Sequence, residues 1–175
     1  MNKKILISGL LVGLFAIIVG LFVYKLLNKK EPHSFAQELP LFEAITLDGI
    51  VFNTDSLSAG KVVVVFYSPG CLFCEHEGKE LSRHANEFTD CRLLFITNAP
   101  IDSAVAYTSR TGVGKIAHFR SLVDTTLKTP LLFGLRTLPT TFIFGDDRQL
   151  INAFEGEVNA KKLLKTIRQH EKSKE

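Results

Sequence analysis

The sequence predicts an α/β domain with a mixed central β-sheet and helices on both faces, preceded by an apolar segment. Residues 62–66 are an unbroken run of Val and Phe, which is typical of a strand buried on both faces. Helical spacing follows over about 72–89, carried by Leu81, His84, Ala85 and Phe88. A second apolar strand over 91–97 completes a β-α-β unit, whose strands are expected to be parallel.

The other elements are read from turn residues and from shorter apolar runs. Asp48-Gly49 between two apolar runs predicts a β-hairpin, and the Gly145–Arg148 turn predicts another between strands 140–144 and 150–154. Gly78 inside the helix following the first long strand indicates a kink. The remaining expected elements are one helical turn within 54–60, helix 102–110, strand 118–123, helix 125–135 and helix 158–171. The order is therefore β-β-turn-β-α-β-α-β-α-β-β-α.

The N-terminal segment predicts a membrane anchor. Residues 5–24 contain no charged side chain, and as a helix they would be about 30 Å long, which spans a bilayer. Two lysines precede this stretch and no small-residue cleavage pattern follows, which favours an uncleaved signal anchor over a cleaved signal peptide. We expect a transmembrane anchor over 1–27, a linker over 28–37 and the folded domain over 38–172.

The charge distribution limits the partners and the location. Residues 1–30 hold five lysines and no acidic residue, so the rest of the chain carries 16 basic and 18 acidic side chains, a net charge of −2. There is no basic stripe with interleaved aromatic residues, so nucleic acid is not an expected partner. Lysines flank the apolar segment on both sides, but the short N-terminal tail and the cysteine chemistry favour export of the domain. We expect a single-pass protein of the inner (cytoplasmic) membrane, facing the periplasm or cell exterior.

Cys71 and Cys74 form the motif to which the chain's chemistry is assigned. The buried strand ends at a Pro69-Gly70 break, which places Cys71 at a strand-to-helix junction. Free backbone N–H groups and the helix dipole stabilise negative charge there, and this makes a thiol more nucleophilic. Cys74 lies one turn deeper, close enough to form a disulfide with Cys71. The spacing predicts a redox switch, whereas Cys91, which opens an apolar strand, is expected to be a buried core residue.

The cysteine pair has two other interpretations. The cysteines are small enough to be ordinary buried apolar residues. A zinc site would have to recruit His76 or His84, and no second CxxC or paired histidine completes a tetrahedral set. We therefore expect no metal site and, because no motif for NADPH or flavin is present, no cofactor.

Two signatures in order resemble the thioredoxin fold, and more closely its TlpA/ResA-like branch of membrane-anchored thiol–disulfide oxidoreductases, a redoxin or AhpC/TSA-like domain. The first is the CxxC at the end of a buried strand. The second is Phe133-Gly134-Leu135-Arg136-Thr137-Leu138-Pro139-Thr140-Thr141-Phe142. The opening pattern of that branch, with its extra N-terminal hairpin, is matched by residues 39–42, 47–49 and 60–63. The resemblance covers about residues 38–170.

The resemblance implies a role for each of four site residues. Cys71 is the attacking cysteine, Cys74 the resolving one, and Pro139 is similar to the cis-proline that packs beside the disulfide. Glu77 occupies the position of an acid that could take the proton from Cys74 as the mixed disulfide resolves.

The sequence also departs from the thioredoxin pattern. Val65 stands where thioredoxins place a buried Asp, Gly70 stands where Trp is usual, and Leu72-Phe73 separates the cysteines without Pro or His. We therefore expect no extreme oxidising potential, and a reductase is favoured.

The expected function is reduction of disulfides in exported proteins, with a dithiol-type electron donor in the membrane restoring the reduced form. The alternative is a non-enzymatic metallochaperone or assembly factor that binds Cu(I) through both thiols. It would use His118 as a distal ligand, but the cysteine spacing is one residue short of that pattern. A peroxidase is a third possibility, in which Ser68 stands near the place where a Thr is usual.

Overall fold

A computed structural model describes residues 13, 15, 17–20, 35–57 and 59–172. The chain divides into two compact units, residues 1–34 and 35–175. In the first unit the described residues are helical. Most of the predicted anchor over 1–27, and of the linker over 28–37, lies outside the described residues. Across the part of the chain that the structure does describe, no helix combines the length and the apolar character needed to cross a bilayer.

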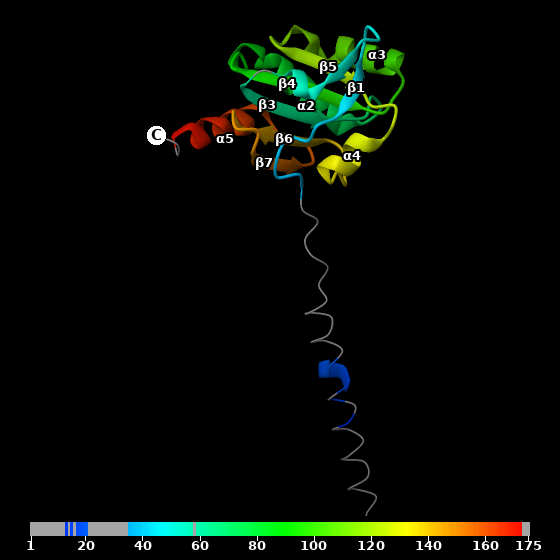
Figure 1. The fold of residues 1–175 in the computed structure, drawn as a ribbon, viewed down its shortest axis with the longest axis vertical. Coiled ribbons are helices and arrows are strands. Elements are labelled where there is room, and N and C mark those ends of the chain that lie inside the picture. The colour runs from blue at the N-terminus through cyan, green and yellow to red at the C-terminus, as the bar shows by residue number, and fades with distance from the viewer. Residues whose placement is uncertain (1–12, 14, 16, 21–34, 58, 173–175) are drawn as a thin grey trace, which may run out of the picture. The chain divides into compact units, whose positions relative to one another are not determined.

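A seven-stranded mixed sheet forms the centre of the second unit (Figure 1), in the order β2-β1-β5-β4-β3-β6-β7. The three strands β3, β4 and β5 run parallel, and their neighbours on both sides run antiparallel to them. The strands are β1 Glu43–Thr46, β2 Val51–Asn53, β3 Lys61–Phe66, β4 Cys91–Thr97, β5 Phe119–Val123, β6 Thr140–Phe144 and β7 Leu150–Glu155.

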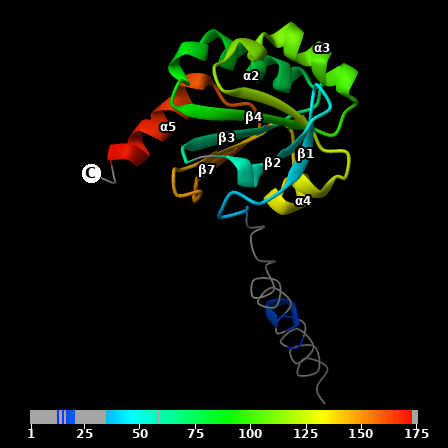
Figure 2. The same ribbon diagram turned by 45° about the horizontal axis from the view of Figure 1, so that its top comes forward.

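Helices cover both faces of the sheet, as predicted. Figure 2 shows α2 and α3 on one side of the strands and α4 on the other. Side chains of α2, α3 and α5 share one apolar core, whereas Phe133 of α4 belongs to the core beneath the opposite face. The helices are α2 Leu72–Arg83, α3 Ile101–Thr111, α4 Lys128–Phe133 and α5 Ala160–Lys172.

Strand β3 is buried on both faces, which confirms the interpretation of its unbroken apolar run. Val63 and Val65 enter the core beneath α2, α3 and α5, and Val62, Val64 and Phe66 enter the other. An aromatic cluster fills this second core, where the Phe133 ring lies 4.9 Å from the Phe66 ring and 5.2 Å from the Phe142 ring between centroids. The strand that leads into the cysteine motif is therefore fixed from both sides.

The predicted order of elements is confirmed, but the helix expected over 72–89 is shorter. It ends at Arg83, because His84 leaves helical geometry with φ −102° and ψ 19°, and a 3₁₀ turn, Ala85–Glu87, follows. Phe88 is nevertheless fully buried, so the apolar spacing was correct although the chain changes helix type before reaching it. Helix α2 is continuous through Gly78, where the sequence predicts a kink.

Candidate active site

Cys71 lies where the turn after β3 enters α2. Its N–H donates to the Ser68 carbonyl at 3.0 Å, and the residue is the N-cap of the helix. The Cys71 Sγ accepts a hydrogen bond from the backbone N–H of Cys74 at 3.2 Å. The sulfur thus occupies the place of an N-cap oxygen, partly open to solvent, where a backbone donor and the helix dipole both favour negative charge.

Cys74 is only 1% exposed, in the first turn of α2. Both thiols are free in this structure, so it represents the dithiol form. Burial raises the pKa of Cys74 to about 12, and the adjacent Cys71 thiol and the charge of Glu77 add to the rise. The two sulfurs therefore differ in the way that thiol–disulfide exchange requires, with one reachable by a partner and the other protonated and shielded.

Glu77 is fully buried, which is unusual for a carboxylate on a helix. The Thr141 hydroxyl donates to its Oε1 at 2.5 Å, and the Val158 N–H donates to its Oε2 at 3.3 Å. Burial raises the pKa of Glu77 to about 7, and these two hydrogen bonds only partly oppose the rise. A carboxyl group with such a pKa exchanges its proton near neutral pH, which is suited to acid–base work.

The peptide bond between Leu138 and Pro139 is cis. Pro139 directly precedes β6, whose first residue, Thr140, lies opposite Phe66 at the end of β3. The Glu77–Thr141 hydrogen bond ties this start of β6 to α2. The fold thus brings the second signature, more than sixty residues further along the chain, to the end of β3 that leads into the cysteines.

Helix α3 supplies two contacts to the cysteine motif that the sequence did not predict. Tyr107 donates its hydroxyl to the Cys74 carbonyl at 2.7 Å. Arg110 donates to the Pro69 carbonyl at 3.0 Å and lies 3.6 Å from the Glu75 carboxylate. The two residues lie three positions apart on α3. In the sequence, Gly78 is the signal that another element approaches α2 closely.

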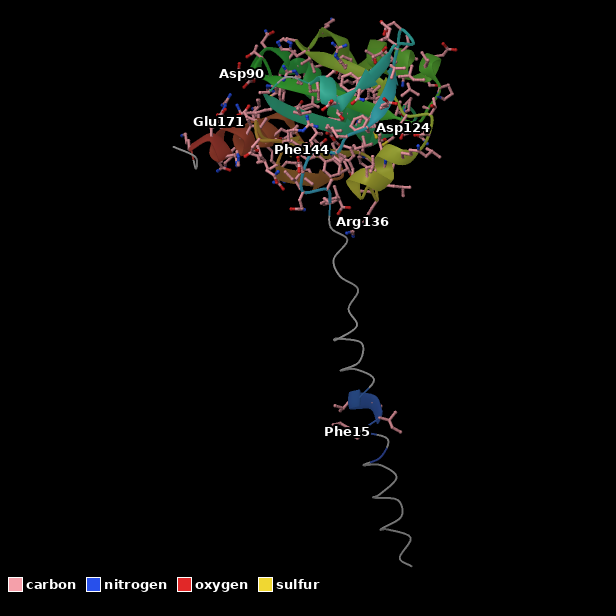
Figure 3. The ribbon with its side chains drawn as sticks, viewed as in Figure 1. Phe15, Asp90, Asp124, Arg136, Phe144 and Glu171 are labelled. Atoms are coloured by element: carbon pink, nitrogen blue, oxygen red, sulfur yellow. The ribbon has the colours of Figure 1, made fainter. Side chains whose placement is uncertain are left out.

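The third cysteine and His118 lie at the other end of the sheet. Cys91 opens β4 opposite Lys61, the first residue of β3, whereas Cys71 follows the last residue of that strand. His118 lines a surface hollow together with Cys91. Figure 3 shows the two ends through its labels, with Asp90 just before β4 and Asp124 just after β5 on opposite sides of the domain. His118 therefore does not lie beside Cys71 and Cys74, where a copper site would need it as the distal ligand.

Cys91 is 5% exposed, as expected of a core residue. Burial raises the pKa of its thiol to about 11. Among the residues that the structure describes, no three His, Cys, Asp or Glu side chains are grouped closely enough to hold a metal ion.

The fold and the cysteine pair define the chain as a thioredoxin-like oxidoreductase. The extra hairpin, β1 and β2, precedes the β3-α2-β4 unit, and the cis-proline precedes β6. The sequence matches the model of the AhpC/TSA family over residues 35–153, and the chain belongs to that family.

Solved structures with the same fold come from several bacteria. A secreted disulfide oxidoreductase of Mycobacterium tuberculosis, homologous to E. coli DsbE, has a TM-score of 0.64 at 20% identity, over 73% of this chain and 95% of that one. The peroxidoxin BcpB of the same organism has a TM-score of 0.66 at 22% sequence identity, over 79% of this chain and 98% of that one. The exposed lipoprotein thioredoxin Etrx1 of Streptococcus pneumoniae has a TM-score of 0.57 at 20% sequence identity, over 74% of this chain and 99% of that one. A search of curated proteins finds no match.

Proposed function

We propose that the protein reduces disulfide bonds of exported proteins, with Cys71 as the nucleophile and Cys74 as the resolving thiol. The observation that carries the proposal is the asymmetry of the pair. The Cys71 sulfur is partly open and accepts the Cys74 N–H, whereas the Cys74 thiol is buried beside it. The relatives that share the fold include a disulfide oxidoreductase and a thioredoxin, which agrees with this reading.

In the first step the Cys71 thiolate attacks one sulfur of the substrate disulfide. A bond forms between Cys71 Sγ and that sulfur, the substrate S–S bond breaks, and the departing substrate thiolate takes up a proton. The N–H of Cys74 and the first turn of α2 stabilise the thiolate before it attacks.

In the second step Cys74 attacks Cys71 Sγ and releases the other substrate thiolate, leaving the Cys71–Cys74 disulfide. The Cys74 proton goes to the Glu77 carboxylate. The pKa of Cys74, about 12, lies well above that of Glu77, about 7, so full proton transfer ahead of bond formation is unfavourable. The Cys71 thiol also contributes to the raised pKa of Cys74, and once Cys71 is in the mixed disulfide this contribution is lost. Proton transfer therefore accompanies S–S bond formation, as in general base catalysis.

Exposed apolar side chains directly follow the attacking cysteine in α2 and favour a protein substrate. Leu72 is 64% exposed and Phe73 is 59% exposed in the helical turn between the two cysteines. A cavity of about 120 Å³ opens at the same sheet edge, lined in part by Tyr67, Asn98 and Leu138. Solvent-facing apolar groups at this position suit an unfolded or loosely packed segment presenting its disulfide.

The protein is proposed to work at the outer side of the inner membrane, facing the periplasm or cell exterior. The twenty uncharged residues at 5–24 support an anchor, and a linker would follow them. Each turnover leaves the protein oxidised by two electrons, so a membrane protein with a dithiol is the proposed donor that restores it.

The proposal is tested by following dithiothreitol-driven reduction of insulin with the full chain in detergent micelles. The wild type should accelerate precipitation of insulin, and Cys71→Ser should lose all of the acceleration. Cys74→Ser should instead accumulate a mixed disulfide with the substrate, visible by mass spectrometry. Cys91→Ala is the matched control and should behave as the wild type. Undiminished activity in Cys71→Ser would contradict the assignment, and tight binding of one Cu(I) without turnover would favour the metallochaperone instead.

A further inference from the structure

Tyr107 makes a buried contact with the cysteine motif that the mechanism above does not use. The residue lies on α3 and is 1% exposed. Its hydroxyl donates to the backbone carbonyl of Cys74 at 2.7 Å, across thirty-three residues of chain. Burial raises the pKa of this phenol above its already alkaline ordinary value, so the hydroxyl remains a donor at every working pH.

Gly78 makes room for this contact. A Cβ atom at position 78 would lie 2.5 Å from the Tyr107 Oη, closer than packed atoms approach, and 3.1 Å from the Thr111 Cγ2, a tight contact. Glycine is unfavourable inside a helix, and α2 runs through Gly78 without a break. Its place in the helix is therefore explained by the close approach of α3 and by the hydroxyl that enters there.

Tyr67 provides an internal comparison for Tyr107. The two rings stack with centroids 4.1 Å apart, and both residues are 1% exposed. The Tyr67 hydroxyl, however, lies 3.2 Å from the Ser121 Oγ of β5. The chain thus contains two stacked, equally buried tyrosines. Tyr107 hydrogen-bonds to the backbone of the resolving cysteine, whereas Tyr67 hydrogen-bonds to the Ser121 side chain of β5.

We propose that Tyr107 is a positioning residue for the resolving thiol, and that Gly78 is the residue that admits it. The inference rests on the proposed function. By holding the Cys74 carbonyl, the hydroxyl fixes the first turn of α2, which contains both the N–H on Cys71 Sγ and the thiol that attacks it. Displacing a reacting group by about 1 Å from its attack position costs on the order of 100-fold in rate. Tyr107 therefore acts most strongly on the second exchange step, in which the thiol of the held residue is the attacking group, and less on the first, to which the same turn contributes only an N–H on Cys71 Sγ.

The two steps are separable with an aromatic disulfide, 5,5′-dithiobis(2-nitrobenzoate), added in equimolar amount to the reduced full chain. Attack by Cys71 forms a mixed disulfide and releases one coloured thiolate. Attack by Cys74 on Cys71 Sγ forms the intramolecular disulfide and releases a second one, while the Cys74 proton is lost to the carboxylate or to water. Stopped-flow absorbance then reports each step as its own phase.

Tyr107→Phe and Tyr67→Phe are the matched variants, because each removes one buried hydroxyl and keeps the stacked ring. We expect Tyr107→Phe to slow the second phase by about 10- to 100-fold, the range expected for a misplaced reacting group, and to slow the first phase much less. Tyr67→Phe should change neither phase by more than about twofold, a variation too small to reflect a misplaced reacting group. Equal effects of both variants on the second phase, or none from Tyr107→Phe, would overturn the inference.

Gly78→Ala tests the same contact with the tyrosine retained. Its methyl group should displace the hydroxyl and slow the second phase. In the Tyr107→Phe background Gly78→Ala should slow this phase less than it does in the wild type, since the hydroxyl is gone and only the tight contact with Thr111 remains. Additive effects would overturn the inference. A wild type that releases only one coloured thiolate would overturn the proposed function itself, whereas a normal wild type with indifferent variants would overturn only the role of Tyr107.

Discussion

Replacing Glu77 with glutamine removes an ionisable group from the interior while keeping its shape. Burial raises the pKa of Glu77 from an ordinary 4.5 to about 7, a difference that corresponds to about 3 kcal/mol. The folded protein holds this proton more tightly than the unfolded chain does. The free energy of unfolding that Glu77 contributes therefore falls as pH rises from about 4.5 to about 7 and is constant above that.

Glutamine does not titrate, and its oxygen can still accept the Thr141 hydroxyl. The difference in unfolding free energy between Glu77→Gln and the wild type should therefore shift by about 3 kcal/mol in favour of the variant between pH 4.5 and pH 7.5. Urea unfolding of the reduced proteins at four pH values across this window measures it. A difference that does not change with pH would refute the assignment of a raised pKa to this carboxyl.

The same variant tests the proton transfer. Without a base the second exchange phase should slow by about 10² to 10⁴, the usual contribution of a general base. In the wild type this phase should accelerate as pH rises through about 7, because only the ionised carboxylate accepts the proton. Glu75→Gln is a suitable control, since Glu75 lies on the same helix but is paired with Lys79 at 2.7 Å near the surface. A wild-type phase that is flat from pH 6 to pH 8 would argue against Glu77 as the base.

Three further predictions concern the scaffold. Leu81→Ala should lower the free energy of unfolding, measured in urea, by about 2–5 kcal/mol, because Leu81 is fully buried on the inner side of α2, and a smaller loss would mean that the core collapses around the cavity. Asp124→Asn should lower the free energy of unfolding by about 2–3 kcal/mol at neutral pH, since the carboxylate accepts four hydrogen bonds from Thr126 and Thr129. These hydrogen bonds outweigh burial and lower the pKa of Asp124, so the difference in unfolding free energy from the wild type should shrink as pH falls below about 3.8. Native wild type should be alkylated by iodoacetamide at Cys71 alone over the first minutes, counted by mass spectrometry, because Cys74 and Cys91 are buried and burial raises the pKa of both thiols; early modification of either would contradict their burial.

Local sequence patterns were enough to predict the order of the elements and the place of the cysteines at the start of α2. The apolar run of β3, the Pro-Gly break and the two hairpin turns are each set by a few neighbouring residues, and the structure confirms them. The cis isomer before Pro139 was implied by the resemblance and is confirmed. The boundary at Arg83 was not predicted, because helical spacing is the same whether Phe88 is reached by an α-helix or by a 3₁₀ turn.

The contacts of α3 could not be predicted, for a different reason. Tyr107 and Arg110 reach the cysteine motif only after two helices have packed, and their partners are backbone carbonyls, which have no identity in a sequence. Glu77 was singled out by its position in the motif. Its full burial, and the hydrogen bonds from Thr141 and Val158, depend on how β6 and the start of α5 meet α2.

The short strand β2 bears on how the domain behaves among unfolded clients. It forms one border of the sheet with only three residues, Val51–Asn53. Although Ile50 and Val51 are exposed, so short a border offers too few free N–H and C=O groups to template a foreign strand. The protein is proposed to meet half-folded chains at the site that follows β3. Its short edge strand β2 thereby protects it from pairing with those chains and promoting their aggregation.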